Sequence, residues 1–131
     1  MAGGNLTMQK RTSDIYQIER FVSLMKSLQE IDPEFPLQYS ICLAEIAMNE
    51  GLSLTQLAQK TDLSLSTISR IVGALSDYRK NNRPYGLVKL IVSKSERRRK
   101  ELYLTPKGAA LIENISENMS DPKAGTSLKT A

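Results

Sequence analysis

The chain has 131 residues, of which 40% are hydrophobic, and a formal net charge of +4, so its length predicts one domain with a modest core. It contains no histidine and one cysteine. This composition removes the usual general base, the usual metal ligands and any internal disulfide. We therefore expect a protein that is not an enzyme and that uses neither a metal nor another cofactor.

The first twelve residues are polar and contain two glycines. They lack the apolar run of a secretory signal, and we expect residues 1–12 to be mobile. No apolar run elsewhere is long enough to cross a bilayer. The sequence therefore predicts a soluble, cytoplasmic protein without a membrane partner.

A first helix is predicted over about 13–31, because apolar residues recur there at intervals of three and four. The apolar stripe is broad for a lone surface helix, so part of it can face a second subunit. A stripe packed wholly within one subunit explains the pattern equally well. The stripe consists of Ile15, Ile18, Phe21, Val22, Met25, Leu28 and Ile31.

A second helix is predicted from Pro36 to the residues before Gly51, since proline suits a first turn and glycine a helix end. Apolar residues fall almost all around it, which indicates a buried central helix. Cys42 lies within this run. We interpret it as a core residue and not as a redox sensor, because a reactive thiol needs cationic neighbours.

Residues 53–79 have the pattern of a helix-turn-helix. Ser53 stands three residues before Gln56, which is the spacing of a capping box. Ser64 can cap the second helix, predicted over 64–79, and the polar break at 61–63 is short. Two capped helices joined by so tight a turn must cross at a steep angle.

The second of these helices carries small hydroxyl groups and one arginine opposite its apolar stripe. We expect the stripe, which begins at Leu65, to be buried. Small hydroxyls fit the major groove of DNA, and arginine can bind guanine through two hydrogen bonds. An ordinary polar face is the alternative, but serine and threonine are middling helix formers. The candidate base-reading residues are Ser64, Ser66, Thr67, Ser69 and Arg70.

The segment between Lys60 and Lys107 holds 12 Lys/Arg and 4 Asp/Glu, which is typical of a surface that faces phosphates. Residues 87–105 read as a β-hairpin whose tip, 94–100, is basic. Such a wing can lie on the DNA backbone or enter a minor groove, whereas a lone edge hairpin needs fewer charges to resist pairing. The candidate contacts are Lys94, Arg97, Arg98, Arg99 and Lys100, with Arg79, Lys80 and Arg83 in the preceding loop.

A last helix is predicted over 106–119, with Thr105 as its cap and Pro106 at its first position. Residues 120–131 are rich in Ser, Thr, Lys, Gly and Pro and are expected to form a mobile tail. The predicted fold is therefore mainly α with a small β-hairpin wing. It is a winged helix-turn-helix domain, 13–119, flanked by N- and C-terminal helices.

This order of elements resembles the MarR family of winged helix-turn-helix transcription regulators, over roughly residues 15–119. The segments that carry the resemblance are PLQYSICLAEIA, LSLTQLAQKTDLSLSTISRIVGAL and GLVKLIVSKSERRRKELYLTPKGAAL. The wing followed by LTPKG is the most specific of them. Family wings carry an Asp-x-Arg pair, and the register here puts Glu96 at the acidic position and Arg98 at the arginine.

The resemblance implies a homodimeric repressor that binds double-stranded DNA at a pseudo-palindromic operator. Arg98 would enter the minor groove, with Glu96 orienting it. A small aromatic or amphipathic effector would bind between the dimer helices and the DNA-binding lobe, where Tyr16, Phe35 and Tyr39 could line a pocket. The helices 13–31 and 106–119 would form the dimer through Ile15, Ile18, Val22, Met25, Leu111 and Ile115.

A winged helix can also serve as a protein-interaction or replication-assembly module. The basic wing would then bind DNA only without sequence preference. A DNA affinity that does not depend on salt, or that shows no preference among sequences, would favour this alternative.

Overall fold

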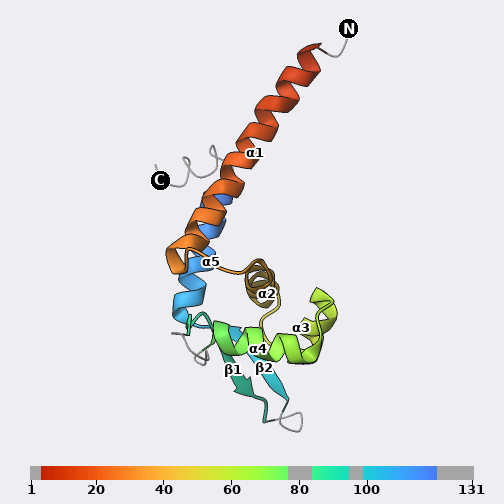
Figure 1. The fold of residues 1–131 in the computed structure, drawn as a ribbon, viewed down its shortest axis with the longest axis vertical. Helices are drawn as coiled ribbons and strands as arrows, with labels where there is room; N and C mark the ends of the chain where they lie inside the picture. The colour runs from red at the N-terminus through yellow and green to blue at the C-terminus, as the bar shows by residue number, and fades with distance from the viewer. Residues whose placement is uncertain (1–3, 77–83, 95–98, 121–131) are drawn as a thin grey trace.

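The computed structural model describes residues 4–76, 84–94 and 99–120, with side chains described from residue 11 onward. The order of elements is α1 (Gly4–Ile31), α2 (Leu37–Met48), α3 (Leu54–Thr61), α4 (Leu65–Leu75), β1 (Val88–Val92), β2 (Lys100–Leu104) and α5 (Pro106–Met119). Figure 1 shows α2, α3, α4 and the hairpin gathered into one lobe, from which α1 extends. This arrangement confirms the predicted fold class, mainly α with a small hairpin.

Helix α1 begins earlier than the sequence predicted. Residues 4–12 were expected to be mobile, but they continue the helix as far as Gly4. This stretch contains no proline, and Met8, Gln9, Lys10 and Arg11 are good helix formers. A helix nucleated over the apolar stripe can therefore propagate through them at little cost.

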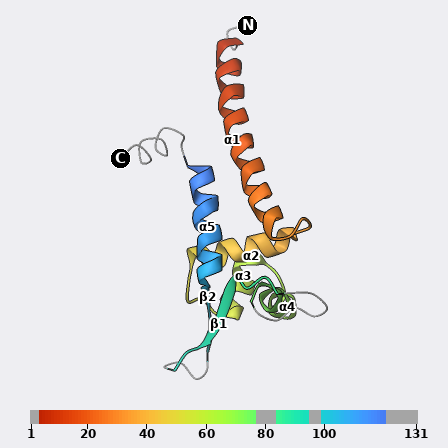
Figure 2. The same cartoon turned by 90° about the vertical axis from the view of Figure 1, so that its left-hand side faces the viewer.

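Helix α1 packs against α5, and Asn118 Nδ2 donates a hydrogen bond to Ser27 Oγ at 3.3 Å. Figure 2 shows that α1 continues well beyond the end of α5. Ser120 caps α5 at its C-terminus, and the predicted mobile tail beyond it lies outside the described residues. Within the described part of the chain, no helix is long and apolar enough to span a membrane.

Helix α2 is buried on one side only. Cys42, Leu43 and Ile46 lie in the core, where α3, α4, β2 and α5 all contact this helix. Leu37 and Met48 are exposed, so the prediction of a helix buried all around was wrong. The described elements pack closely on one side of α2, whereas Leu37 and Ile41 face an open cavity between α2, α1 and α5.

The helix-turn-helix forms as its capping residues predict. The Ser53 side chain accepts a hydrogen bond from Gln56 N, and Ser53 N donates to Gln56 Oε1, which completes the capping box. Asp62 ends α3 in the left-handed conformation, with a φ of 61°, and Leu63 packs against the core. The Ser64 side chain then caps α4 by accepting from Thr67 N.

Helix α4 ends at Leu75, not at residue 79 as predicted, and Ser76 is its C-cap. The returning chain supplies the reason. Tyr85 N donates to Ala74 O at 3.1 Å, and Leu87 N donates to Leu75 O at 2.7 Å. These bonds satisfy carbonyls that a longer helix would otherwise have used.

The two strands pair antiparallel, from Val88 opposite Leu104 to Val92 opposite Lys100. The hairpin is fixed to the loop before α3, because Leu102 N donates to Leu52 O at 2.9 Å. Thr105 then caps α5 as expected, accepting from Gly108 N. The hairpin therefore has a firm base beside α3.

Gly108 holds the first turn of α5 against the start of the hairpin. A Cβ at this position would lie 2.0 Å from Leu87 O. A side chain of any size would have to push the backbone of Leu87 away. Glycine is thus required here for a close approach of two backbones.

Candidate nucleic-acid interface

The outer face of α4 presents the polar residues that the sequence singled out. Ser64, Ser66, Ser69 and Arg70 are exposed, and Thr67 is half-buried. The opposite face supplies much of the core through Ile68, Ile71, Val72 and Leu75. The helix therefore separates an anchoring face from an outward polar face.

Two of the five candidate residues are engaged in capping their own helix. Ser64 Oγ accepts from Thr67 N at 3.2 Å and donates to Thr67 Oγ1 at 2.9 Å. Ser66 Oγ lies 3.2 Å from Ser64 Oγ at the edge of this network. The side chains of Ser69 and Arg70 make no hydrogen bond within the described part of the chain, and they are the side chains most free to reach a ligand.

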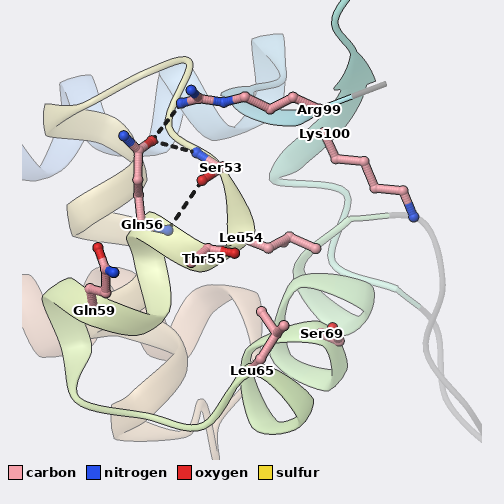
Figure 3. A pocket seen from close by; sticks show the side chains of 9 residues that line it. All are labelled: Ser53, Leu54, Thr55, Gln56, Gln59, Leu65, Ser69, Arg99 and Lys100. Atoms are coloured by element: carbon pink, nitrogen blue, oxygen red, sulfur yellow. Dashed lines mark hydrogen bonds between the residues drawn. The ribbon is translucent and has the colours of Figure 1, made fainter. Parts of the chain in front are cut away.

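Leu65 was expected in the buried stripe, but it is 50% exposed. It is the first residue of α4, and it lies beside Leu54 and Ser69 at the edge of a groove (Figure 3). The apolar stripe runs past the end of the core here, because the turn after α3 is too short to cover it. The periodicity of the sequence could not show at which residue of α4 the burial by the core ends.

The groove lies between α3, α4 and the base of the wing and has a volume of about 590 Å³. Most of its lining residues are polar or charged, but Leu54 and Leu65 add apolar surface, and Figure 3 shows how side chains from all three elements surround it. The lining residues are Ser53, Leu54, Thr55, Gln56, Gln59, Leu65, Ser69, Arg99 and Lys100. Thr55, Gln56 and Gln59, which come from α3, were not among the predicted site residues.

The described part of the wing contains three of the predicted basic residues. Lys94 and Lys100 are exposed at the two ends of the hairpin tip. Arg99 is half-buried, and its Nη2 donates to Gln56 Oε1 at 2.6 Å. The other predicted contacts, Glu96, Arg97 and Arg98 in the tip and Arg79, Lys80 and Arg83 before it, lie outside the described residues.

The residues predicted for dimerisation fall into two groups. Ile15 and Ile18 are each 58% exposed, and Val22 is exposed as well. Met25 and Ile115 are half-buried against the core, and Leu111 lies in the core itself, 8% exposed. Leu111 therefore points into its own subunit, because α5 packs its apolar stripe on the lobe beneath it.

An apolar cavity of about 240 Å³ lies between α1, α2 and α5. Phe21, Leu37 and Ile41 line it, and Phe35 lines a neighbouring cavity of about 310 Å³. The predicted pocket residue Tyr16 lines neither cavity. Its ring lies under the Arg20 guanidinium, 5.4 Å from ring centroid to Cζ.

Tyr39 is also not part of these cavities. Its ring packs edge-on against Phe35 and Tyr85, with centroid distances of 6.1 Å in both cases. The aromatic residues that were candidates for a ligand pocket therefore form a packed cluster in large part. The walls of the 240 Å³ cavity come instead mainly from aliphatic side chains and from Phe21.

Comparisons with known proteins agree with this architecture. Residues 42–79 match the family model of the IclR helix-turn-helix domain. No curated protein is significantly similar to the chain in sequence. The match to the family model covers the second half of α2 and the whole of the helix-turn-helix.

Solved structures extend the likeness to nearly the whole chain. A structure of MarR is 20% identical over 89% of this chain and 74% of that one, with a TM-score of 0.56. A complex of S. aureus MepR with DNA is 16% identical over 95% and 90%, with a TM-score of 0.62. A MarR family regulator from Silicibacter pomeroyi is 22% identical over 95% and 73%, with a TM-score of 0.53. The chain therefore has the winged helix-turn-helix fold of the MarR-type regulators.

Proposed function

We propose that the protein is a cytoplasmic transcription regulator that binds double-stranded DNA in a sequence-specific manner. The observation that carries this proposal is the outward face of α4, where Ser66, Ser69 and Arg70 are exposed beside the wing. A helix of this kind fits the major groove, and a basic hairpin beside it fits the adjacent backbone.

Arg70 is the principal base-reading residue in this proposal. Its guanidinium can donate two hydrogen bonds to the O6 and N7 atoms of a guanine, and Ser66 and Ser69 can bond neighbouring base edges. Leu65 adds an exposed apolar group at the start of the same helix, suited to the methyl group of thymine. The N-terminal half of α4 would thus read adjacent bases.

The wing supplies charge that does not depend on sequence. Lys94 and Lys100 are exposed and can pair with phosphates on either side of a minor groove. We assign the same role to Arg97 and to the basic residues of 79–83, and a minor-groove contact oriented by Glu96 to Arg98. Together these contacts fix the register of α4 on the duplex.

We further propose that the protein acts as a homodimeric repressor. The exposed apolar residues of α1, which include Ile15, Ile18 and Val22, suit burial against a second copy. Two-fold symmetry would set two α4 helices about one helical turn of DNA apart, so the operator is pseudo-palindromic. MepR, a protein of the same fold, has been solved in complex with DNA.

The apolar cavity between α1, α2 and α5 suits a small aromatic or amphipathic effector. It lies between the proposed dimer helices and the reading lobe, and Phe21 can stack on an aromatic ring. A ligand there would act on the angle between α1 and the lobe, and hence on the spacing of the two α4 helices.

Selection of bound duplexes from a random pool of double-stranded DNA tests the proposal. The purified protein is expected to enrich a two-fold symmetric motif whose half-sites are about 10 base pairs apart. The Arg70→Ala variant serves as the control and should not enrich the same motif. If no motif is enriched at all, a protein-interaction or replication-assembly module becomes the better account.

A further inference from the structure

We propose that Arg99 is a positioning residue. It holds the wing against α3 through Gln56 and does not itself contact DNA. The proposal begins from the geometry of Gln56. Its Oε1 accepts from Ser53 N at 2.9 Å and from Arg99 Nη2 at 2.6 Å. Figure 3 shows both bonds meeting at the one oxygen atom.

The capping box holds this oxygen atom in place independently of Arg99. Gln56 N donates to Ser53 Oγ at 3.2 Å while the Gln56 side chain returns to Ser53 N. The side chain is therefore held at both ends, and its acceptor is preorganised. A hydrogen bond from a charged guanidinium to such an acceptor is stronger than one between neutral groups.

The contact with Gln56 completes a series that runs along the hairpin toward its tip. Leu102 N donates to Leu52 O, and Glu101 forms an isolated antiparallel β-bridge with Ser53. Arg99, two residues closer to the tip, donates to Gln56. Among the described contacts, the one to Gln56 is the nearest to the tip. It therefore limits how far residues 99 and 100 can move away from α3.

The wing needs such an anchor because it has little support of its own. It consists of two strands, and a two-stranded hairpin alone is marginally stable in water. Of the β1 residues, only Val88 at the base lies in the core, whereas Leu90, Ile91 and Val92 are exposed, so the core does not hold the far half of this strand in place. Releasing Arg99 should loosen the tip and with it Lys94, which follows β1.

This role differs from a phosphate contact in a measurable way. A phosphate contact would depend on the charge of Arg99 and not on Gln56, which is neutral. A positioning contact requires both partners, so removing either one should have the same effect, and removing both should add nothing. The consequence for DNA affinity rests on the proposed function, whereas the contact itself can be tested without DNA.

The first arm of the experiment measures the position of the wing in the free protein. Spin labels are attached at Lys94→Cys and Lys60→Cys in a Cys42→Ala background, and labelled protein is diluted with excess unlabelled protein to remove distances between subunits. We expect a narrow distance distribution, which Arg99→Ala and Gln56→Ala broaden alike. An unchanged distribution in both variants would overturn the proposal.

Three matched variants separate the contact from the stability of α3. Ser53→Ala removes the other half of the capping box but keeps the Gln56 side chain, and should leave the distribution narrow. Gln56→Glu keeps a side-chain oxygen that can accept from both Ser53 N and Arg99, and it should also leave the distribution narrow. Gln59→Ala alters an exposed α3 residue of the same groove and should have no effect. Broadening by Ser53→Ala or Gln59→Ala would mean that α3, and not the contact, controls the wing.

The second arm measures affinity for the selected duplex at several salt concentrations. Arg99→Ala and Gln56→Ala should each weaken binding by roughly three- to thirty-fold, and the double variant by no more. If Arg99→Ala weakens binding further in the Gln56→Ala background and lowers the salt slope by about one, Arg99 is a phosphate contact and the proposal fails. If the wild-type protein binds no DNA, the proposed function fails while the spin-label arm still decides the role of Arg99.

Discussion

At the scale of single residues, Cys42 shows how burial controls chemistry. The thiol is fully buried in α2. Burial, with a smaller contribution from the charge of Glu45, raises the pKa of the Cys42 thiol to about 11. Because the thiolate is the reactive form, this residue should act as a small core residue and not as a redox sensor.

The raised pKa predicts a specific dependence of stability on pH. In the unfolded chain a cysteine thiol ionises near pH 8.5, whereas in the folded chain it stays protonated up to about pH 11. Its contribution to stability is therefore complete below about pH 8.5 and is lost as the pH rises toward 11. The slope approaches about 1.4 kcal/mol per pH unit.

Guanidinium unfolding of the wild type and of Cys42→Ala at a series of pH values checks this prediction. Other titrating groups are common to both proteins, so the difference between the two free energies of unfolding isolates Cys42. Between about pH 8.5 and 10, we expect the free energy of unfolding to fall more steeply with pH for the wild type than for Cys42→Ala. Parallel curves for the two proteins would contradict the burial argument.

At the scale of elements, Tyr85 joins three parts of the fold. Its hydroxyl donates to Asp32 Oδ2 at 2.6 Å, in the loop between α1 and α2. Its backbone N–H donates to Ala74 O at the end of α4, and its carbonyl accepts from Lys107 Nζ of α5. The end of α4 is thus tied both to the loop that follows α1 and to α5.

Tyr85→Phe is expected to lower the free energy of unfolding by about 1–2 kcal/mol, because it deletes a hydrogen bond to a carboxylate and keeps the ring. The ring would still contact Phe35, whose centroid lies 5.0 Å away. Tyr39→Phe is the matched control, since the Tyr39 hydroxyl makes no hydrogen bond to the described residues, and it should change stability by less than about 0.5 kcal/mol. Equal losses in urea unfolding of the two variants would show that the Tyr85 hydroxyl contributes nothing specific.

At the scale of the whole molecule, the apolar residues on the extended part of α1 stand away from the lobe. Figure 2 shows the N-terminal part of this helix beyond the end of α5, and Ile15 and Ile18 are each 58% exposed. A monomer gains nothing from exposing so many large apolar groups along one helix. The proposed homodimer would bury them against a second subunit.

Ile18→Glu should therefore prevent dimerisation, since it would bury an unpaired carboxylate in the interface. We expect the free energy of dimerisation to become less favourable by about 3 kcal/mol or more, which raises the dimer dissociation constant at least about a hundredfold. Sedimentation equilibrium measures this change. Ser23→Glu adds the same charge about 140° around the helix at an exposed position and should leave the dimer intact. An unchanged dimer in Ile18→Glu would place the interface elsewhere.

Local signals in the sequence were sufficient for the helix-turn-helix and the hairpin. The Ser53 and Ser64 caps, the short turn and the alternation around Leu102 depend on near neighbours in the chain. The outward face of α4 followed from the same periodicity. These features could be predicted because their causes lie within a few residues of one another.

The features that sequence could not predict depend on distant parts of the chain. Leu75 ends α4 because residues near Tyr85 return to bond its carbonyls. Leu65 is exposed because the core ends before it. Leu37 and Ile41 of α2 are exposed because α1 and α5 leave a cavity over them. Arg99 looked like the other wing cations, and only the tertiary arrangement brings it to Gln56.

The central claim is that α4 reads bases while the wing binds the backbone. The affinity of Arg70→Ala and Lys100→Ala for the selected duplex and for a scrambled one tests it most directly. Arg70→Ala should lose about 1–3 kcal/mol on the selected duplex and little on the scrambled one. Lys100→Ala should weaken binding to both duplexes alike and lower the salt slope by about one. An equal loss on both duplexes for Arg70→Ala would contradict the claim.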